Sequence, residues 1–176
     1  MAGKKGLRMP RVGQVGIVVQ DMDKAIDYFE TTLGLGPWAV FDEEPVWCRE
    51  NGKEVTYKGQ FALAQAGPVQ LELIQILEGR SLYSDVLGEG EGVHHLGFFV
   101  HDLDERLRAV REAGIPVLQH ALLKRLGVKI EYAYLDTTGT GGVITEYIKA
   151  SFMGLPVPMR FGPLVRLSAW IAGKVG

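Results

Sequence analysis

Apolar and amphipathic segments follow one another in the same order twice along the chain. Short apolar runs between turn residues predict strands, and apolar residues spaced three or four apart predict helices. The first half is expected to hold strands at 13–19, 37–41, 56–66 and 69–76, and a helix that starts after the N-cap Asp21 and stops at Gly34. The second half is expected to hold strands at 93–101, 116–119, 128–135 and 143–148, and a helix at 102–113. Each half therefore has the order β-α-β-β-β.

The segments outside these elements differ from them in composition. Residues 42–53 are polar and are predicted to form a loop, 81–87 one or two helical turns, and 88–92 a Gly/Glu linker. The tail contains three prolines, followed by Leu164, Leu167 and Ile171 on one helical face. We interpret this part as a helix that packs on the chain or on a partner, with a helix lying on a membrane surface as the alternative.

Residues 14–23 align without a gap on residues 95–104, which indicates an internal repeat. The identical pairs are Gly16/Gly97, Val19/Val100, Asp21/Asp102 and Asp23/Asp104. Residues 69–74 match 143–148 in the same way, and this match pairs Glu72 with Glu146. Two copies are too few for a solenoid. They predict an α+β fold of two pseudo-symmetric βαβββ modules, 12–78 and 93–149, whose curved mixed sheet surrounds a cleft, followed by a C-terminal extension, 150–176.

Composition and charge exclude several classes of protein. The chain is 47% hydrophobic and 23% charged, and it has neither an apolar run of membrane-spanning length nor a secretory signal, so we expect a cytoplasmic protein without an integral membrane segment. Both ends are basic but the region between them is acidic, which argues against nucleic-acid binding. The single cysteine, Cys48, excludes an internal disulfide, and no histidine lies near it in the sequence to favour a nucleophile.

The repeat also singles out four polar side chains. Gln14 and His95 occupy equivalent positions in the first strand of each half, and Glu72 and Glu146 interrupt the last strand of each half. A carboxylate in an apolar strand is costly to bury unless it is paired or bound to a metal ion. Taken singly, each residue has a structural explanation, a salt bridge for a glutamate or a core hydrogen bond for a histidine. Together they suit a divalent ion such as Zn²⁺, Co²⁺, Ni²⁺ or Mn²⁺.

His94 stands next to His95, and neighbouring residues of a strand point to opposite faces. Only one of the two is therefore expected to face a metal ion, and the repeat selects His95. We interpret His94 as a buried hydrogen-bonding residue, and His101 and His120 as surface residues.

Two segments carry a family resemblance: residues 15–29, and Gly-Val-His-His-Leu-Gly-Phe-Phe-Val at 92–100. Over about 12–149 the chain resembles the vicinal oxygen chelate superfamily, and its Gly-x-His-His stretch is most similar to methylmalonyl-CoA epimerases. The resemblance implies glyoxalase-like paired modules, a homodimer, and metal ligands on the first and last strands of each module. Those positions are Gln14, Glu72, His95 and Glu146.

Gln14 departs from the epimerase pattern, which has histidine there, and is similar to the Gln, Glu, His, Glu set of zinc glyoxalase I. Extradiol dioxygenases use two histidines and one carboxylate around iron, so oxygen activation is not expected of this set. The superfamily's bleomycin-resistance proteins generally lack the ligands, whereas here all four positions hold donors.

The resemblance therefore implies a metal-dependent isomerase or epimerase that removes a proton α to a carbonyl, like methylmalonyl-CoA epimerase. Glu146 would serve as both ligand and base, and a second catalytic carboxylate would come from Glu54, or from Glu50 nearby. The expected partner is a small-molecule carbonyl substrate such as an acyl-CoA thioester. The alternatives are a glyoxalase I-type lyase and a metal-free binding or resistance protein.

Overall fold

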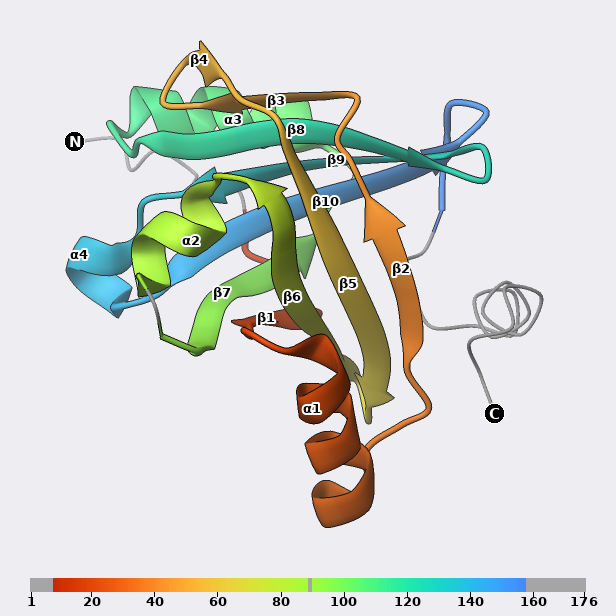
Figure 1. The fold of residues 1–176 in the computed structure, drawn as a ribbon. Coiled ribbons are helices and arrows are strands. Elements are labelled where there is room, and N and C mark those ends of the chain that lie inside the picture. The colour runs from red at the N-terminus through yellow and green to blue at the C-terminus, as the bar shows by residue number, and fades with distance from the viewer. Residues whose placement is uncertain (1–7, 89, 158–176) are drawn as a thin grey trace.

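The computed structural model describes residues 8–88 and 90–157, whose strands join in one curled mixed sheet (Figure 1). The first half contains β1 (Gln14–Val18), α1 (Met22–Asp27) with the π-helical turn η1 (Tyr28–Thr32), β2 (Ala39–Glu43), β3 (Trp47–Glu50), β4 (Lys53–Glu54), β5 (Tyr57–Ala66), β6 (Val69–Gly79) and α2 (Leu82–Leu87). The second contains β7 (Gly92–Phe99), α3 (Leu103–Glu112), β8 (Val117–Arg125), β9 (Val128–Leu135), α4 (Thr138–Gly141), β10 (Ile144–Phe152) and β11 (Leu155–Pro156).

The order of strands shows the internal symmetry that the repeat predicts. It runs β2-β5-β6-β1-β7-β10-β9-β8-β3-β4, with β11 paired to β10. In each half the last long strand lies parallel to the first, β6 beside β1 and β10 beside β7. The antiparallel pair β1/β7 joins the halves at the centre of the sheet. The predicted α+β fold with a curved mixed sheet is thus confirmed.

Three apolar clusters hold the sheet and helices together. Helix α1 packs Met22 with Trp38 and Leu73, and α3 packs Leu103 and Leu107 on the second half. Both clusters lie on the outer face of the curl, and the buried residues of each come from one half. The third cluster fills the inner face and takes residues from both halves: Val18, Cys48, Tyr57, Phe61, Ile74, Leu82, Tyr83, Ala121, Tyr132, Tyr134, Ile144 and Ile148. Residues of the two halves therefore meet on the concave side.

The prediction of a loop at 42–53 is wrong, because this segment contains β3 and the start of β4. Strand β3 leaves the first half and pairs with β8 at the edge of the second, placing Cys48 opposite Ala121. Such a distant pairing leaves no periodic signal in a segment this polar. Cys48 is buried, and burial together with the Glu50 carboxylate raises the pKa of its thiol to about 12, which opposes a nucleophilic role.

Most other predicted elements are present, with different ends. Asp21 caps α1 by accepting a hydrogen bond from the Lys24 amide. Strands β8 and β10 extend several residues beyond the predicted 116–119 and 143–148. Within the described part of the chain no helix is long and apolar enough to cross a membrane. The helix predicted at 164–171 lies outside the described residues.

The pairing of β1 with β7 explains why glycine recurs in the repeat. Gly16 lies opposite His95, and Gly97 lies opposite Gln14. A Cβ atom at Gly16 would overlap the imidazole of His95, and one at Gly97 would come within 2.9 Å of the Cβ of Gln14. Each glycine thus makes room for the polar side chain of the other half.

Gly16→Ala is therefore expected to destabilise the protein by about 1–3 kcal/mol, because a buried imidazole would have to move to admit the new methyl group. Gly139→Ala is the matched control. Gly139 lies in helix α4, and a Cβ atom there meets no neighbour within 4 Å. The check is the free energy of unfolding from urea denaturation of both variants. Equal stability of the two would contradict the packing described here.

Candidate metal site

Four adjacent strands at the centre of the sheet, β6, β1, β7 and β10, carry the predicted ligands in two neighbouring rows. One row runs Glu72, Gly16, His95, and the other runs Gln70, Gln14, Gly97, Glu146. Residues directly opposite each other on paired strands share a face of the sheet. All four predicted ligands therefore project from the concave face, two from each half.

Three of these side chains meet at one nitrogen atom. The Nε2 atom of His95 lies 3.0 Å from Oε2 of Glu146 and 3.6 Å from Oε2 of Glu72. His95 is 0% exposed and Glu146 4%. Within the described residues neither Nε2 of His95 nor Oε2 of Glu146 has a hydrogen bond of good geometry, although the two atoms are close. Buried polar atoms without such bonds require an explanation, for example a bound ion.

The fourth predicted ligand, Gln14, lies in the same layer but bonds elsewhere. Its Nε2 atom donates a 2.8 Å hydrogen bond to Oε1 of Gln70, inside the protein. This bond holds the amide so that Oε1 of Gln14 is the atom left to accept from, or coordinate, a ligand. Sequence reasoning missed Gln70, although it interrupts the same apolar strand as Glu72. Its counterpart in the second half is the apolar Ile144, so the two halves are not equivalent here.

The chemical types of the donor atoms suit a divalent ion, although the side chains are not arranged around a common point as metal ligands would be. Across residues 8–88 and 90–157, no three His, Cys, Asp or Glu side chains are disposed to hold a metal ion. The structure brings Glu72, His95 and Glu146 together, and keeps Gln14 turned to Gln70. An imidazole nitrogen, two carboxylates and an amide oxygen are nevertheless donors that Zn²⁺ and its neighbours accept.

Burial and the neighbouring charges shift the pKa values of Glu72 and His95. Burial raises the pKa of Glu72 to about 8, with a further increase from Glu146 and an opposing effect of His95. Burial disfavours the charged form of His95, but the nearby Glu146 and Glu72 carboxylates outweigh it and raise the pKa of the imidazole above its ordinary value. In the absence of an ion these groups therefore retain protons that a bound metal would displace.

A β-bulge corrects the prediction that His94 and His95 point to opposite faces. His95 pairs with Gly16 and Val93 with Ile17, so His94 is an extra residue without a partner on β1. The bulge places both imidazoles inside the protein, with their Nδ1 atoms 3.0 Å apart. His94 is thus a buried hydrogen-bonding residue, as predicted. Burial and the neighbouring His95 lower its pKa to about 3, so it is neutral.

Four buried tyrosines form a cluster beside the histidines, and two of them, Tyr83 and Tyr134, contact the imidazole rings. The hydroxyls of Tyr57 and Tyr132 lie 2.7 Å apart, and those of Tyr83 and Tyr134 lie 2.9 Å apart. All four are buried, and burial raises the pKa of every one of their hydroxyls. Tyr83 comes from α2, which therefore covers the concave face beside the candidate site. The site is apolar at its border and polar only where the ligands converge.

The two candidates for a second carboxylate lie in different places. Glu54 is on the edge strand β4 with 81% of its side chain exposed, and it pairs with Arg49, so the structure does not bring it to the site. Glu50 lies in the row of Glu146, connected across the sheet through Gln119 and Tyr134. Its Oε1 atom accepts hydrogen bonds from Gln119 (2.6 Å) and from the Leu82 amide (2.7 Å). Glu50 is therefore the better-placed acid.

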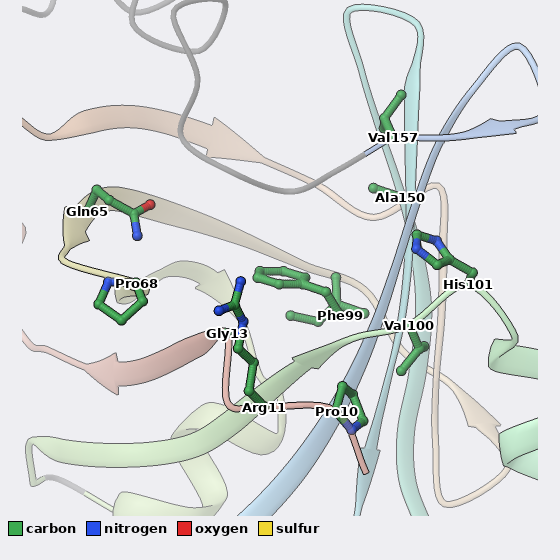
Figure 2. Close-up of a pocket in the computed structure, with 11 residues that line it drawn as sticks. Pro10, Arg11, Gly13, Gln65, Pro68, Phe99, Val100, His101, Ala150 and Val157 are labelled. Atoms are coloured by element: carbon green, nitrogen blue, oxygen red, sulfur yellow. The ribbon is translucent and has the colours of Figure 1, made fainter. Parts of the chain in front are cut away.

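A pocket of about 280 Å³ opens beside Gln14, at the end of the concave face away from α2 (Figure 2). Its apolar floor includes Phe99 and Ile148, which also contact the inner cluster. Figure 2 shows the Arg11 side chain extending between Gln65 and Phe99. Ile148, which lines the pocket, and Gln14 both lie about 3 Å from the position that a Cβ atom at Gly97 would take, so the pocket approaches the candidate ligands near Gly97.

Comparison with known proteins decides the family. Residues 13–133, more than half of the chain, match the family described as the glyoxalase/bleomycin resistance protein/dioxygenase superfamily. The chain belongs to this superfamily. An uncharacterized Bacillus subtilis protein, YqjC, is 29% identical over 139 residues, which cover 78% of this chain and 91% of YqjC.

Solved structures support the same fold. Methylmalonyl-CoA epimerase from Mycobacterium tuberculosis is 22% identical, with 94% of this chain and 95% of the epimerase covered and a TM-score of 0.58. A variant of the Streptomyces coelicolor epimerase, in complex with 2-nitronate-propionyl-CoA, is also 22% identical, with coverages of 86% and 100% and a TM-score of 0.59. At such identities the likeness establishes the fold of this superfamily member, a curled α+β sheet.

The raised pKa values of Glu72 and His95 predict how the stability of the metal-free protein depends on pH. A carboxyl whose pKa rises from 4.5 to about 8 on folding keeps a proton that the unfolded chain has lost, so the free energy of unfolding should fall as pH increases across that window. The raised pKa of His95 acts in the same direction. Glu72→Gln should flatten the dependence. The check is urea denaturation of both proteins in chelator at about pH 5 to 8.

A wild-type protein whose stability rises with pH over this range would contradict the proposed environment of Glu72. Glu78→Gln is the control, because the Glu78 side chain is 74% exposed on the same strand.

Proposed function

We propose that this protein is a metal-dependent enzyme that removes and returns a proton α to a carbonyl group, in the manner of an epimerase. The observation that carries the proposal is the convergence of Glu146 and Glu72 on Nε2 of His95. Among the described residues, the buried Nε2 of His95 and Oε2 of Glu146 are close but have no hydrogen bond of good geometry. Ordinary salt bridges would not leave both partners without a hydrogen bond in a dry interior. Metal ligands in the ion-free protein would show this arrangement.

The proposed ion is Zn²⁺, Co²⁺, Ni²⁺ or Mn²⁺, and the residues that would hold it are Gln14, Glu72, His95 and Glu146. When bound, it would supply a Lewis acid for the carbonyl oxygen of a substrate, which stabilises the enolate formed by proton loss. Gln14 would use its Oε1 atom, since its amide nitrogen already donates to Gln70. Gly16 and Gly97 leave the space in which these side chains meet.

Glu146 is the proposed base at this site. Its carboxylate is 4% exposed, and among the described residues its Oε2 atom has no hydrogen bond of good geometry. Because this carboxylate is buried, a proton taken from carbon would be returned rather than lost to solvent. Glu50, in the same row of the sheet, is the proposed acid for the opposite face of the substrate. An epimerase needs such a second group, because inversion requires reprotonation from the other side.

The proposed substrate is a small carbonyl compound with an anionic part, such as an acyl-CoA thioester. The pocket beside Gln14 supports an extended substrate, and Arg11 at its mouth supports a negative charge on it. The Streptomyces coelicolor epimerase of the same fold is solved with an acyl-CoA analogue. Arg11 takes part in no ion pair among the described residues, so its charge is available.

A glyoxalase I-type lyase is the second candidate, and Gln14 favours it. The set Gln, Glu, His, Glu is similar to that of zinc glyoxalases, whereas epimerases resembling this chain have histidine in place of the glutamine. Both reactions begin with loss of a proton next to a carbonyl, so the same base would serve. The assays differ: the epimerase exchanges solvent deuterium into methylmalonyl-CoA, and the lyase forms lactoylglutathione from the methylglyoxal–glutathione adduct.

The first test is the metal content and activity of protein purified without chelators. We expect about one equivalent of divalent ion per chain, and proton exchange with one of the two substrates. Glu146→Gln should abolish exchange, with the exposed Glu78→Gln as its control. Less than about 0.2 equivalents of metal after Zn²⁺, Co²⁺ or Mn²⁺ is offered would overturn the enzyme proposal in favour of a metal-free binding protein.

The second test separates the two acids. If Glu146 and Glu50 serve opposite faces, Glu50→Gln should still exchange deuterium into one stereoisomer of the substrate while it loses interconversion of the two. Removal of one base of a pair blocks only the steps on its own face. The check is NMR of exchange starting from each resolved stereoisomer. Full interconversion by Glu50→Gln would remove Glu50 from the mechanism.

A further inference from the structure

The contact between His94 and His95 is a feature of the site that the proposed ligand set leaves unexplained. The two Nδ1 atoms are 3.0 Å apart, inside the protein, where one must donate and the other accept. The contact exists because the bulge turns His94 to the side of its neighbour. In a regular strand the two rings would lie on opposite faces. The bulge therefore adds an imidazole behind the one that faces the carboxylates.

We propose that His94 is a positioning residue, whose Nδ1 atom accepts a hydrogen bond from Nδ1–H of His95 and thereby directs the Nε2 atom of His95 toward the space beside Glu72 and Glu146. This inference rests on the proposed role of His95 as a metal ligand. A neutral imidazole carries one proton, and a ring that coordinates through Nε2 must carry it on Nδ1. Histidine ligands usually donate that proton to a carboxylate or a backbone carbonyl. Here the acceptor within 3.0 Å is another imidazole.

The surroundings of His94 hold it in the orientation that this role needs. Its ring packs against both Tyr83 and Tyr134, with centroid distances of 4.9 Å and 5.1 Å, and the residue is 2% exposed. If Nδ1 accepts, the ring proton of His94 is on Nε2, which is buried and has no hydrogen-bond partner in the part of the chain that the structure describes. Rotating the ring would break its contact with His95 without giving it another partner.

Two buried residues, Gln70 and His94, thus support predicted metal ligands by hydrogen bonds of different kinds. Gln70 accepts from the amide of Gln14, and His94 accepts from the ring of His95. In both cases the supporting residue accepts the hydrogen bond that the predicted metal ligand donates. The other polar atom of that side chain, Oε1 of Gln14 or Nε2 of His95, therefore remains available for a metal ion. The two supports differ because the bulge occurs on β7 and not on β1.

Two variants separate the hydrogen bond from the packing. His94→Phe keeps an aromatic ring against the tyrosines but removes the acceptor. His94→Asn places an amide oxygen near the position of Nδ1 and should restore it. His120→Phe is the control, since His120 bonds Glu131 on another strand pair and takes no part in the site. Circular dichroism and thermal unfolding establish which variants fold.

The decisive readout is the protonation pattern of the two rings in metal-free, ¹⁵N-labelled wild-type protein. Long-range ¹H–¹⁵N NMR should show Nδ1–H on His95, an unprotonated Nδ1 on His94, and a ¹⁵N–¹⁵N coupling across the hydrogen bond between them. A proton on Nδ1 of His94, or the absence of the coupling, would overturn the proposal. This result does not depend on any variant folding.

The second readout is the affinity for Co²⁺, measured by calorimetric titration. Loss of an outer support weakens metal binding typically 10–100-fold, so we expect that loss for His94→Phe and near wild-type affinity for His94→Asn and His120→Phe. Wild-type affinity in a folded His94→Phe variant would overturn the proposal. If wild-type protein binds no metal ion, the proposed function fails, while the NMR result still decides the hydrogen bond between the rings.

Discussion

The candidate site depends on the antiparallel pairing of β1 with β7. This pairing sets Gly16 opposite His95 and Gly97 opposite Gln14, so that each half provides the space for the side chain of the other. Neither half could bury its ligand alone, because the clearance comes from the partner strand. A larger residue at either glycine would push a buried polar group out of place. The pairing thus links the stability of the fold to the geometry of the site.

The cost of this arrangement is the burial of groups that prefer water. Two carboxylates meet the buried imidazole of His95, with 4% of Glu146 and 15% of the Glu72 side chain exposed, and the ring of Tyr134 packs beside the imidazole. Burying such charges without compensation is strongly unfavourable. The metal-free protein reduces the cost by retaining protons, as the raised pKa values of Glu72 and His95 indicate. A metal ion in place of these protons would compensate the same charges directly. The unfavourable burial of these groups is thus connected with the proposed chemistry of the site.

The sequence predicts the parts of this account that repeat within it. The matched positions of Gln14 and His95, and of Glu72 and Glu146, place four predicted ligands on strands that the structure brings side by side. Features that occur in one half only could not be predicted in this way. The strand at Trp47–Glu50 depends on a distant partner, so Glu50 was less favoured than the exposed Glu54. The bulge at His94 depends on the register with β1, and local alternation predicts the opposite orientation.

The most direct test of the central claim, that both halves of the chain form one metal site, is anomalous X-ray diffraction from crystals of the Co²⁺- or Zn²⁺-loaded protein. The account predicts a single peak on the concave face, with donor atoms of Gln14, Glu72, His95 and Glu146 at about 2.0–2.3 Å. A peak bound by residues of one half alone, or the absence of any peak between these strands in metal-loaded crystals, would contradict it.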